Sequence, residues 1–183
     1  MKILVLNGSS RERGNTERLT QAVLRDLPHT VINLREKRIL PIDDKRHTEE
    51  GFQPVDDEFD EVITQMLSHD LLIFATPLYW YGMSGLMKNF VDRWSQALRD
   101  SRYTFKDDMM KKEAYVVIVG GDNPRIKALP LVQQFQYIFG FVSTPFRGYV
   151  IGEGGKPGDV ENDERAMLEA EALHKQLNMK LHG

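Results

Sequence analysis

A run of small polar residues follows the first apolar segment of the chain, Ile3–Leu6, and a helical pattern begins directly after it. The run reads Gly8-Ser9-Ser10-Arg11-Glu12-Arg13-Gly14-Asn15-Thr16. The first N–H groups of a helix have no intrahelical acceptors and attract a phosphate. Ser9, Asn15 and Thr16 can donate to phosphate oxygens, and Arg11 can pair with the dianion. The loop predicts an anchor for a nucleotide-like ligand; the alternative is a helix N-cap at Asn15 after a flexible turn.

The spacing in this run excludes several better-known anion loops. No Lys precedes Thr16, so the run is not a P-loop, and Ser10 stands where the dinucleotide-binding fingerprint has its second glycine. A phosphatase loop needs a cysteine, and the chain has none. The remaining interpretation is an anion-binding loop that is rich in hydroxyl and amide groups and has one well-placed cation.

Two further loops follow apolar strand-like segments. The first holds Pro77, Leu78, Tyr79, Trp80, Tyr81 and Gly82. Its flat aromatic faces suit a planar heteroaromatic ring. The alternative is an aromatic patch that closes a subunit interface or caps the core. The second contains Gly120 and Gly121, whose N–H groups could contact the polar edge of such a ring, although for this loop alone an ordinary strand-to-helix turn is the better interpretation.

Apolar strand patterns and amphipathic helix patterns alternate along the chain, which predicts a parallel sheet covered by helices on both faces. Strands are expected at 3–6, 30–34, 71–75, 114–119 and 144–151, and helices at 17–27, 56–69, 85–98, 126–139 and 160–181. Pro145 predicts an edge position or a strand start for the last strand. We expect a flavodoxin-like α/β three-layer sandwich with a five-stranded sheet in the order 2-1-3-4-5. Its ligand would lie beyond the strands' carboxyl ends.

Length and composition fit one ordinary globular domain, residues 1–183. The net charge of −3, from 24 basic and 27 acidic residues, argues against nucleic acid as a partner. No segment approaches the ~20 apolar residues of a membrane helix, so no membrane partner is expected. Nothing resembles a signal peptide, and we expect the protein in the cytoplasm. The histidines show no ligand spacing, and no metal site is expected.

Together these loops resemble those of the NADPH-dependent FMN reductase family, over nearly the whole chain. The first run looks like the family's flavin phosphate loop. The second, Thr76-Pro77-Leu78-Tyr79-Trp80-Tyr81-Gly82-Met83-Ser84-Gly85-Leu86-Met87-Lys88-Asn89-Phe90-Val91-Asp92-Arg93, looks like the family's P-x-Y segment followed by G-x-x-K-x-x-x-D-R. The resemblance implies that Ser9, Arg11, Asn15 and Thr16 bind the FMN phosphate. It implies that the flavin ring lies against residues 77–82, and less securely against Gly120 and Gly121.

The resemblance further implies an oxidoreductase in which NADPH or NADH passes hydride to FMN. A small acceptor such as a quinone, flavin, azo or nitro compound then replaces the nicotinamide in ping-pong fashion. The cofactor carries this chemistry, so no side chain is named as catalytic. Homodimers or homotetramers are expected, and the absence of cysteine excludes an iron–sulfur cluster bound by cysteines. A single-electron carrier working with protein partners and a flavin-free association module are the alternatives.

Overall fold

Five parallel strands form the centre of the computed structural model, which describes residues 1–182. The strands are β1 Ile3–Asn7, β2 His29–Asn33, β3 Leu71–Pro77, β4 Glu113–Gly120 and β5 Phe146–Glu153. They lie in the order β2-β1-β3-β4-β5, as predicted. The most apolar strands, β1, β3 and β4, are central because helices cover both faces of a parallel sheet. The predicted flavodoxin-like α/β arrangement is confirmed.

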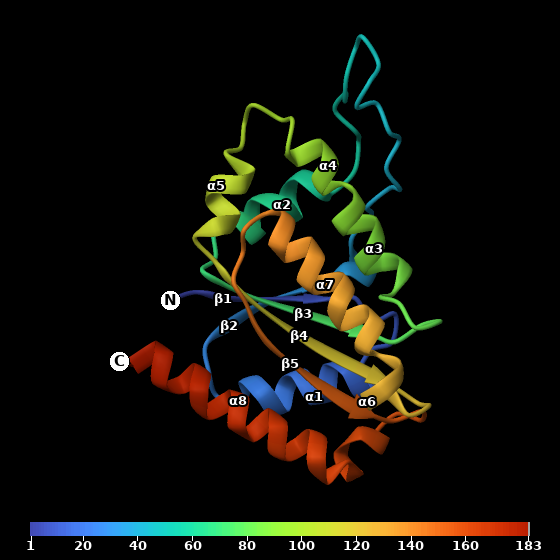
Figure 1. Cartoon of the computed structure of the whole chain (residues 1–183), viewed down its shortest axis with the longest axis vertical. Helices are drawn as coiled ribbons and strands as arrows, with labels where there is room; N and C mark the ends of the chain where they lie inside the picture. Colours follow the sequence, from blue (N-terminus) through green and yellow to red (C-terminus); the bar gives the residue numbers. More distant parts are fainter. Residues whose placement is uncertain (183) are drawn as a thin grey trace.

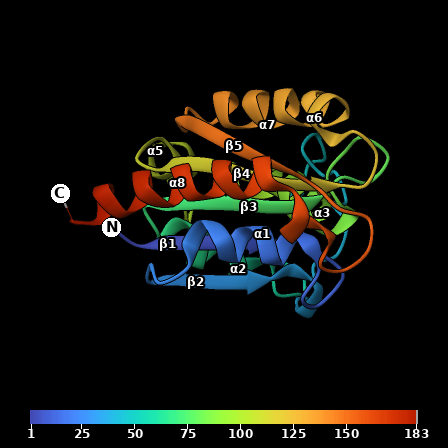
Figure 2. The same ribbon diagram turned by 90° about the horizontal axis from the view of Figure 1, so that it is seen from below.

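Helices cover the two faces of this sheet unequally. The α-helices are α1 Asn15–Leu24, α2 Phe59–Leu67, α3 Gly85–Asp92, α4 Trp94–Ala97, α5 Phe105–Met110, α6 Pro124–Lys127, α7 Leu129–Phe141 and α8 Glu164–His182. Two 3₁₀ turns, η1 Leu34–Glu36 and η2 Asp159–Asn162, complete the elements. Helices α1 and α8 lie together on one face, and the view from below looks onto them (Figure 2). Helices α2, α3 and α7 lie on the other face (Figure 1).

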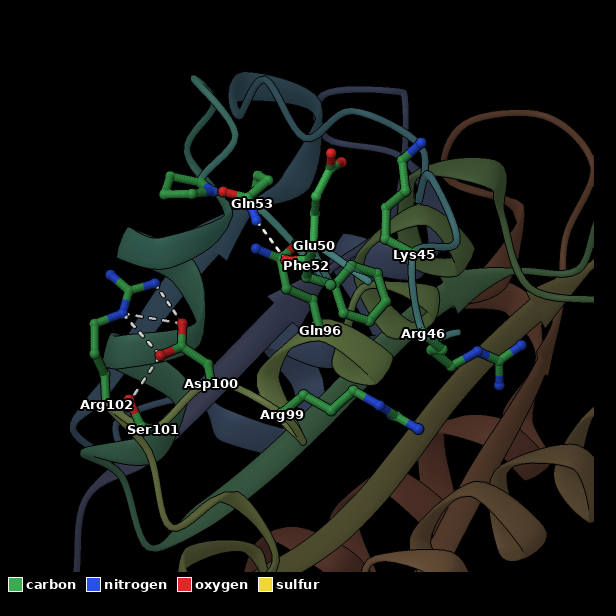
Figure 3. A pocket seen from close by; sticks show the side chains of 12 residues that line it. Lys45, Arg46, Glu50, Phe52, Gln53, Gln96, Arg99, Asp100, Ser101 and Arg102 are labelled. Atoms are coloured by element: carbon green, nitrogen blue, oxygen red, sulfur yellow. Dashed lines mark hydrogen bonds and ion pairs between the residues drawn. The ribbon is translucent and has the colours of Figure 1, made fainter. Parts of the chain in front are cut away.

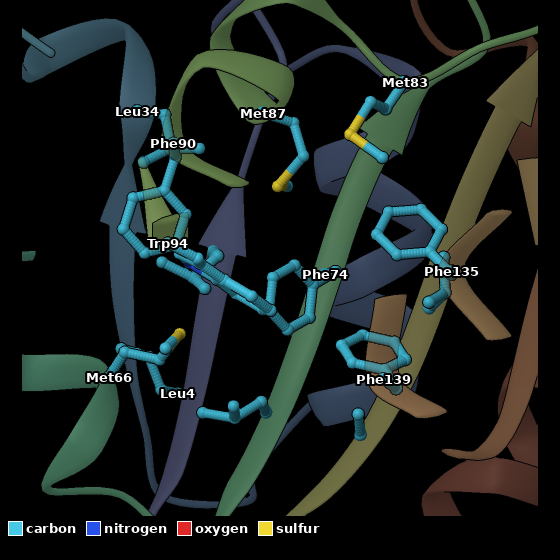
Figure 4. Close-up of a cluster of buried hydrophobic side chains, with 14 of the residues drawn as sticks. Leu4, Leu34, Met66, Phe74, Met83, Met87, Phe90, Trp94, Phe135 and Phe139 are labelled. Carbon is cyan, nitrogen blue, oxygen red and sulfur yellow. The ribbon is translucent and has the colours of Figure 1, made fainter. Parts of the chain in front are cut away.

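Two apolar cores result, one on each side of the sheet. The larger one surrounds Phe74 of β3, whose ring centroid lies 6.0 Å from that of Trp94 and 5.1 Å from that of Phe139 (Figure 4). Edge-on aromatic contacts of this kind add to the hydrophobic gain of burying the rings. Because both faces of the central strands are packed, their carboxyl ends are held rigidly at one edge of the molecule.

Several predicted boundaries are wrong, and proline explains two of them. The last strand begins at Phe146 and not at residue 144, because Pro145 cannot donate to the ladder; its carbonyl still accepts from Ala114 N. Pro145 thus stands directly before an edge strand, as expected. The predicted helix at 126–139 is broken at Ala128, one residue before the turn that contains Pro130. Pro130 has no N–H to donate to the carbonyl of Ile126, so the helical hydrogen-bond ladder is interrupted there.

The other differences lie at helix ends. The predicted helix at 85–98 is two helices that meet at Arg93, where Gln96 N donates to Arg93 O in a tightened i→i+3 turn. Helix α2 starts at Phe59, three residues later than predicted. The closing helix at 160–181 divides into η2 and α8, and α5 was not predicted at all. The alternative of an N-cap at Asn15 is wrong, because Gly14 is the N-cap and no side chain caps α1.

No helix within residues 1–182 is both long enough and apolar enough to cross a bilayer.

Candidate active site

A cavity of about 140 Å³ opens at the carboxyl edge of the sheet, where β1 and β3 are neighbours and the chain leaves them in opposite directions. This is the place at which doubly wound folds bind ligands. Four loops meet there, because β1, β3, β4 and β5 all end at the same edge. The lining residues are Ser9, Arg11, Gly14, Asn15, Thr16, Pro77, Leu78, Tyr79, Val119, Gly120, Gly121, Gly154 and Gly155.

The loop after β1 is held by its own side chains. Ser9 N donates to Asn7 Oδ1 at 3.0 Å. The Ser9 hydroxyl accepts from Arg11 N at 3.2 Å and lies 3.1 Å from Arg11 O, to which it donates. Ser9 is therefore buried within the turn, and its hydroxyl shapes the loop through contacts with Arg11.

Helix α1 presents unused donors to the cavity. Its first helical hydrogen bond runs from Arg18 N to Gly14 O, so the N–H groups of Asn15, Thr16 and Glu17 lack intrahelical acceptors. Within residues 1–182 these three groups donate to no other protein atom either. The Thr16 side chain is 3% exposed and lines the cavity, and its hydroxyl has no partner in the same described part of the chain. The helix start thus offers both backbone and hydroxyl donors to an anion.

The Asn15 side chain forms hydrogen bonds with the loop between β5 and η2. Its Nδ2 donates to Lys156 O at 2.8 Å, and its Oδ1 accepts from Gly158 N at 2.8 Å. Both ends of the amide are therefore used by the protein. Arg11 reaches the same loop more weakly, with Nη1 3.5 Å from Gly155 O, and it pairs with no carboxylate in the described residues. Its guanidinium remains available to a dianion.

Glycines form the opposite wall of the cavity. A Cβ at Gly120 would lie 3.1 Å from both Leu78 Cδ2 and Pro124 Cβ. A Cβ at Gly154 would lie 2.7 Å from Asn15 Nδ2, and Gly154 N donates to Gly120 O at 2.9 Å. Glycine is thus required where these backbones approach each other, and the wall offers peptide groups in place of side chains. We did not predict the 154–155 segment, although its paired glycines after the last strand are a usable signal.

The aromatic loop after β3 divides between cavity and surface. Pro77, Leu78 and Tyr79 line the cavity, and Leu78 N donates to Val119 O at 2.8 Å. The other three residues predicted to meet a ring, Trp80, Tyr81 and Gly82, do not line it. The Tyr79 hydroxyl lies 3.4 Å from Ser10 Oγ, so this loop and the loop after β1 meet across the mouth.

Trp80 and Tyr81 form a tight two-residue turn closed by mutual backbone bonds between Tyr79 and Gly82, of 3.0 and 2.9 Å. Their φ angles are +48° and +65°. This left-handed backbone costs roughly 1–2 kcal/mol for each non-glycine residue, and hairpins of this type prefer Asn-Gly. Trp80 is 96% exposed. The fold therefore holds an indole outward beside the cavity at an energetic cost.

Comparison with known proteins identifies the family of the chain. The sequence model of the family described as NADPH-dependent FMN reductase matches residues 1–154. The chain belongs to this family. Membership makes it an oxidoreductase with FMN as cofactor and NAD(P)H as reductant. All residues that line the cavity, except Gly155, fall within the matched range.

Individual relatives extend the similarity over nearly the whole chain. The Bacillus subtilis protein YwqN, named as a candidate NAD(P)H-dependent FMN-containing oxidoreductase, is 51% identical over 96% of this chain and 97% of its own. A solved Bacillus subtilis structure described as Trp repressor binding protein is 44% identical, with a TM-score of 0.80 over 94% of this chain and 97% of that one. An FMN-dependent NADH:quinone oxidoreductase of Dechloromonas aromatica is 28% identical over 97% of this chain and 99% of its own.

Proposed function

We propose that this protein transfers reducing equivalents from NAD(P)H to a small acceptor, in two successive half-reactions at the cavity described above. The observation that carries the proposal is the group of unused donors at the start of α1. The Thr16 hydroxyl, the backbone N–H groups of Asn15 and Thr16 and the Arg11 guanidinium belong to neighbouring residues that line the cavity. They fit the phosphate of FMN, because each is a donor and none is neutralised by a carboxylate within residues 1–182.

FMN, when bound, supplies the hydride-accepting chemistry. The protein supplies position and electrostatics. Pro77, Leu78 and Tyr79 form an apolar and aromatic wall for a planar ring. Gly120 and Gly121 bring peptide groups to the opposite side, where their N–H dipoles stabilise negative charge on a ring edge. Ser9 and Asn15 keep the phosphate loop and the 154–158 loop in place through their own hydrogen bonds.

The lining contains no Asp, Glu, His, Lys or Cys among the described residues, so the cavity holds no side chain suited to proton transfer near neutral pH. This supports chemistry that the cofactor carries. Trp80, Tyr81 and Gly82 stand outside the cavity, and we place them at the entrance for nicotinamide and acceptor. Strained backbone at a site mouth supports a role in binding. A quinone is the acceptor that the name of the Dechloromonas relative suggests, and azo, nitro and free flavin compounds share its planar electron-poor character.

The test is spectroscopic. Protein reconstituted with FMN is reduced by NADPH or NADH under nitrogen while the flavin absorbance is followed, and benzoquinone is then added. We expect bleaching followed by reoxidation, and parallel double-reciprocal plots in steady state. A protein that takes up FMN but oxidises neither nicotinamide without a separate reductase would be an electron carrier, and the proposal would be wrong.

A further inference from the structure

A second and larger cavity of about 500 Å³ lies between loop residues 45–54 and helix α4 with the turn that follows it (Figure 3). It shares no lining residue with the cavity at the carboxyl edge. Its volume is typical of sites for small organic ligands. The flavin chemistry proposed above does not require it, and its lining carries recognition chemistry of its own.

Phe52 gives this cavity an apolar wall. Its side chain is half-buried, yet it belongs to neither apolar core and forms no aromatic pair with any ring in residues 1–182. Figure 3 shows the ring between the loop and helix α4, close to the Gln96 side chain. An aromatic face that packs on no core residue is available to a planar ligand.

Gln96 gives the cavity a fixed donor. The residue is 6% exposed, and its Oε1 accepts from Arg93 Nε at 2.9 Å. Arg93 is itself held by Asp57 at 2.6 Å. The orientation of the Gln96 amide is therefore set, and its Nε2 has no acceptor within the described chain while lining the cavity. The Nε2 atom itself remains accessible to solvent at the cavity, so it can donate to a ligand that brings an acceptor.

Arg99 gives the cavity a cation without a counter-ion. Its Nη1 donates to Ser95 O of its own helix at 3.2 Å, and no carboxylate of residues 1–182 lies within ion-pair distance. The neighbouring cations are different: Arg46 pairs with Asp44, and Arg102 pairs with Asp100 and also with Asp60. In Figure 3 the guanidinium groups of Arg46 and Arg99 point toward the same end of the cavity. An anion at that end would be paired by Arg99.

We propose that this cavity binds a small planar anion. An aromatic or heteroaromatic ring stacks on Phe52, an acceptor atom of the ligand takes the Gln96 Nε2 hydrogen, and a carboxylate, sulfonate or phosphate group pairs with Arg99. The site is separate from the flavin cavity, so it can be filled while FMN and its substrates are bound.

Isothermal titration of the FMN-loaded protein tests this, because bound FMN occupies the phosphate anchor at the start of α1, and the variants below distinguish this cavity from the entrance for NAD(P)H and acceptor. The probes are adenosine 5′-monophosphate and naphthalene-2-carboxylate, with adenosine and inorganic phosphate as half-ligands. We expect at least one of the two anions to bind at one molecule per chain. Each half-ligand should bind at least tenfold more weakly. Failure of both anions to bind saturably, or equal binding by a half-ligand, would refute the proposal.

Three variants and one control locate the site. Arg99→Gln and Phe52→Leu should each weaken the anion about tenfold or more. Gln96→Glu keeps the acceptor for Arg93 and removes the donor, so binding should be lost. Arg165→Gln, an exposed arginine paired with Glu169 on α8, is the matched control and should bind like the parent protein. NAD(P)H oxidation should persist in Arg99→Gln, which separates this proposal from the flavin chemistry. Equal affinity in all four variants would contradict the assignment.

Discussion

Polar atoms around the flavin cavity divide into those that the fold uses and those that it leaves free. The Ser9 hydroxyl is occupied by Arg11 backbone groups, and the Asn15 amide is occupied by the 156–158 segment. The Thr16 hydroxyl has no partner in residues 1–182. Residue type and spacing identified four candidate phosphate ligands, and all four line the cavity. They could not separate the roles, because the partners of Asn15 lie more than 140 positions away in the sequence.

We therefore expect substitutions of the free donors to weaken the binding of FMN much more than the binding of riboflavin. Thr16→Val keeps the shape and removes the free hydroxyl, and Arg11→Ala removes the unpaired cation. Hydrogen bonds to charged groups are worth roughly 1.5–3 kcal/mol, so each change should weaken FMN about tenfold or more. The affinity for riboflavin, which lacks the phosphate, should be almost unchanged. Fluorescence titration of both flavins measures the difference, and an equal loss for FMN and riboflavin would contradict the phosphate assignment.

Thr20→Val is the matched control. The Thr20 hydroxyl donates to Thr16 O one turn further along the same helix and lies away from the cavity. Its removal tests whether a lost hydroxyl on α1 changes flavin affinity through the helix alone, and it should leave both flavins unaffected.

At the scale of elements, the apolar runs of β1, β3 and β4 were predictable because covered central strands tolerate few polar residues. Helix α5 was not predicted, because its six residues, FKDDMM, are too few to show a helical period. The junction of α3 and α4 was also missed. What fixes it is an ion pair with a residue 36 positions away, which no local pattern reveals.

That ion pair joins Arg93 to Asp57 at 2.6 Å, with side chains 2% and 1% exposed. Burial opposes the charge on Asp57, but hydrogen bonds from Arg93 and from two backbone N–H groups outweigh it and lower the Asp57 pKa. Asp57→Asn leaves the Arg93 cation buried without its carboxylate. We expect a loss of roughly 3–5 kcal/mol in the free energy of unfolding, measured by urea denaturation at pH 7.

The same pair predicts a pH dependence. Because the folded-state pKa of Asp57 is lowered, its contribution to stability is complete above the unfolded value of about 4 and is lost as the pH falls through the folded value. The parent protein should therefore lose stability below about pH 4 more steeply than Asp57→Asn. Asp107→Asn, at an exposed position without an ion pair in residues 1–182, should behave like the parent protein. An equally steep loss of stability at acidic pH in the parent protein and in Asp57→Asn would contradict this account.

At the scale of the whole molecule, the segment around α7 is unusual because it lacks charged side chains. Residues 128–146 contain no charged side chain, although α7 lies on the outside of the sheet. Leu129, Tyr137 and Phe141 are 46%, 69% and 62% exposed, and their spacing by multiples of four places them on one helix face. Ile126 of α6 is 64% exposed. Exposed apolar surface of this kind marks protein–protein contacts.

We therefore expect the homodimer or homotetramer inferred from the family to form through α7. Tyr137→Glu combined with Phe141→Glu would place two carboxylates in that interface, and unpaired buried charge is strongly unfavourable. Light scattering after size-exclusion chromatography should show a multiple of 21.1 kDa for the parent protein and 21.1 kDa for the double variant. Leu168→Glu, at a 70% exposed position of α8, is the control and should keep the parent mass. A parent protein that runs as a monomer at micromolar concentration would refute the assembly, and an unchanged mass in the double variant would move the interface to another surface.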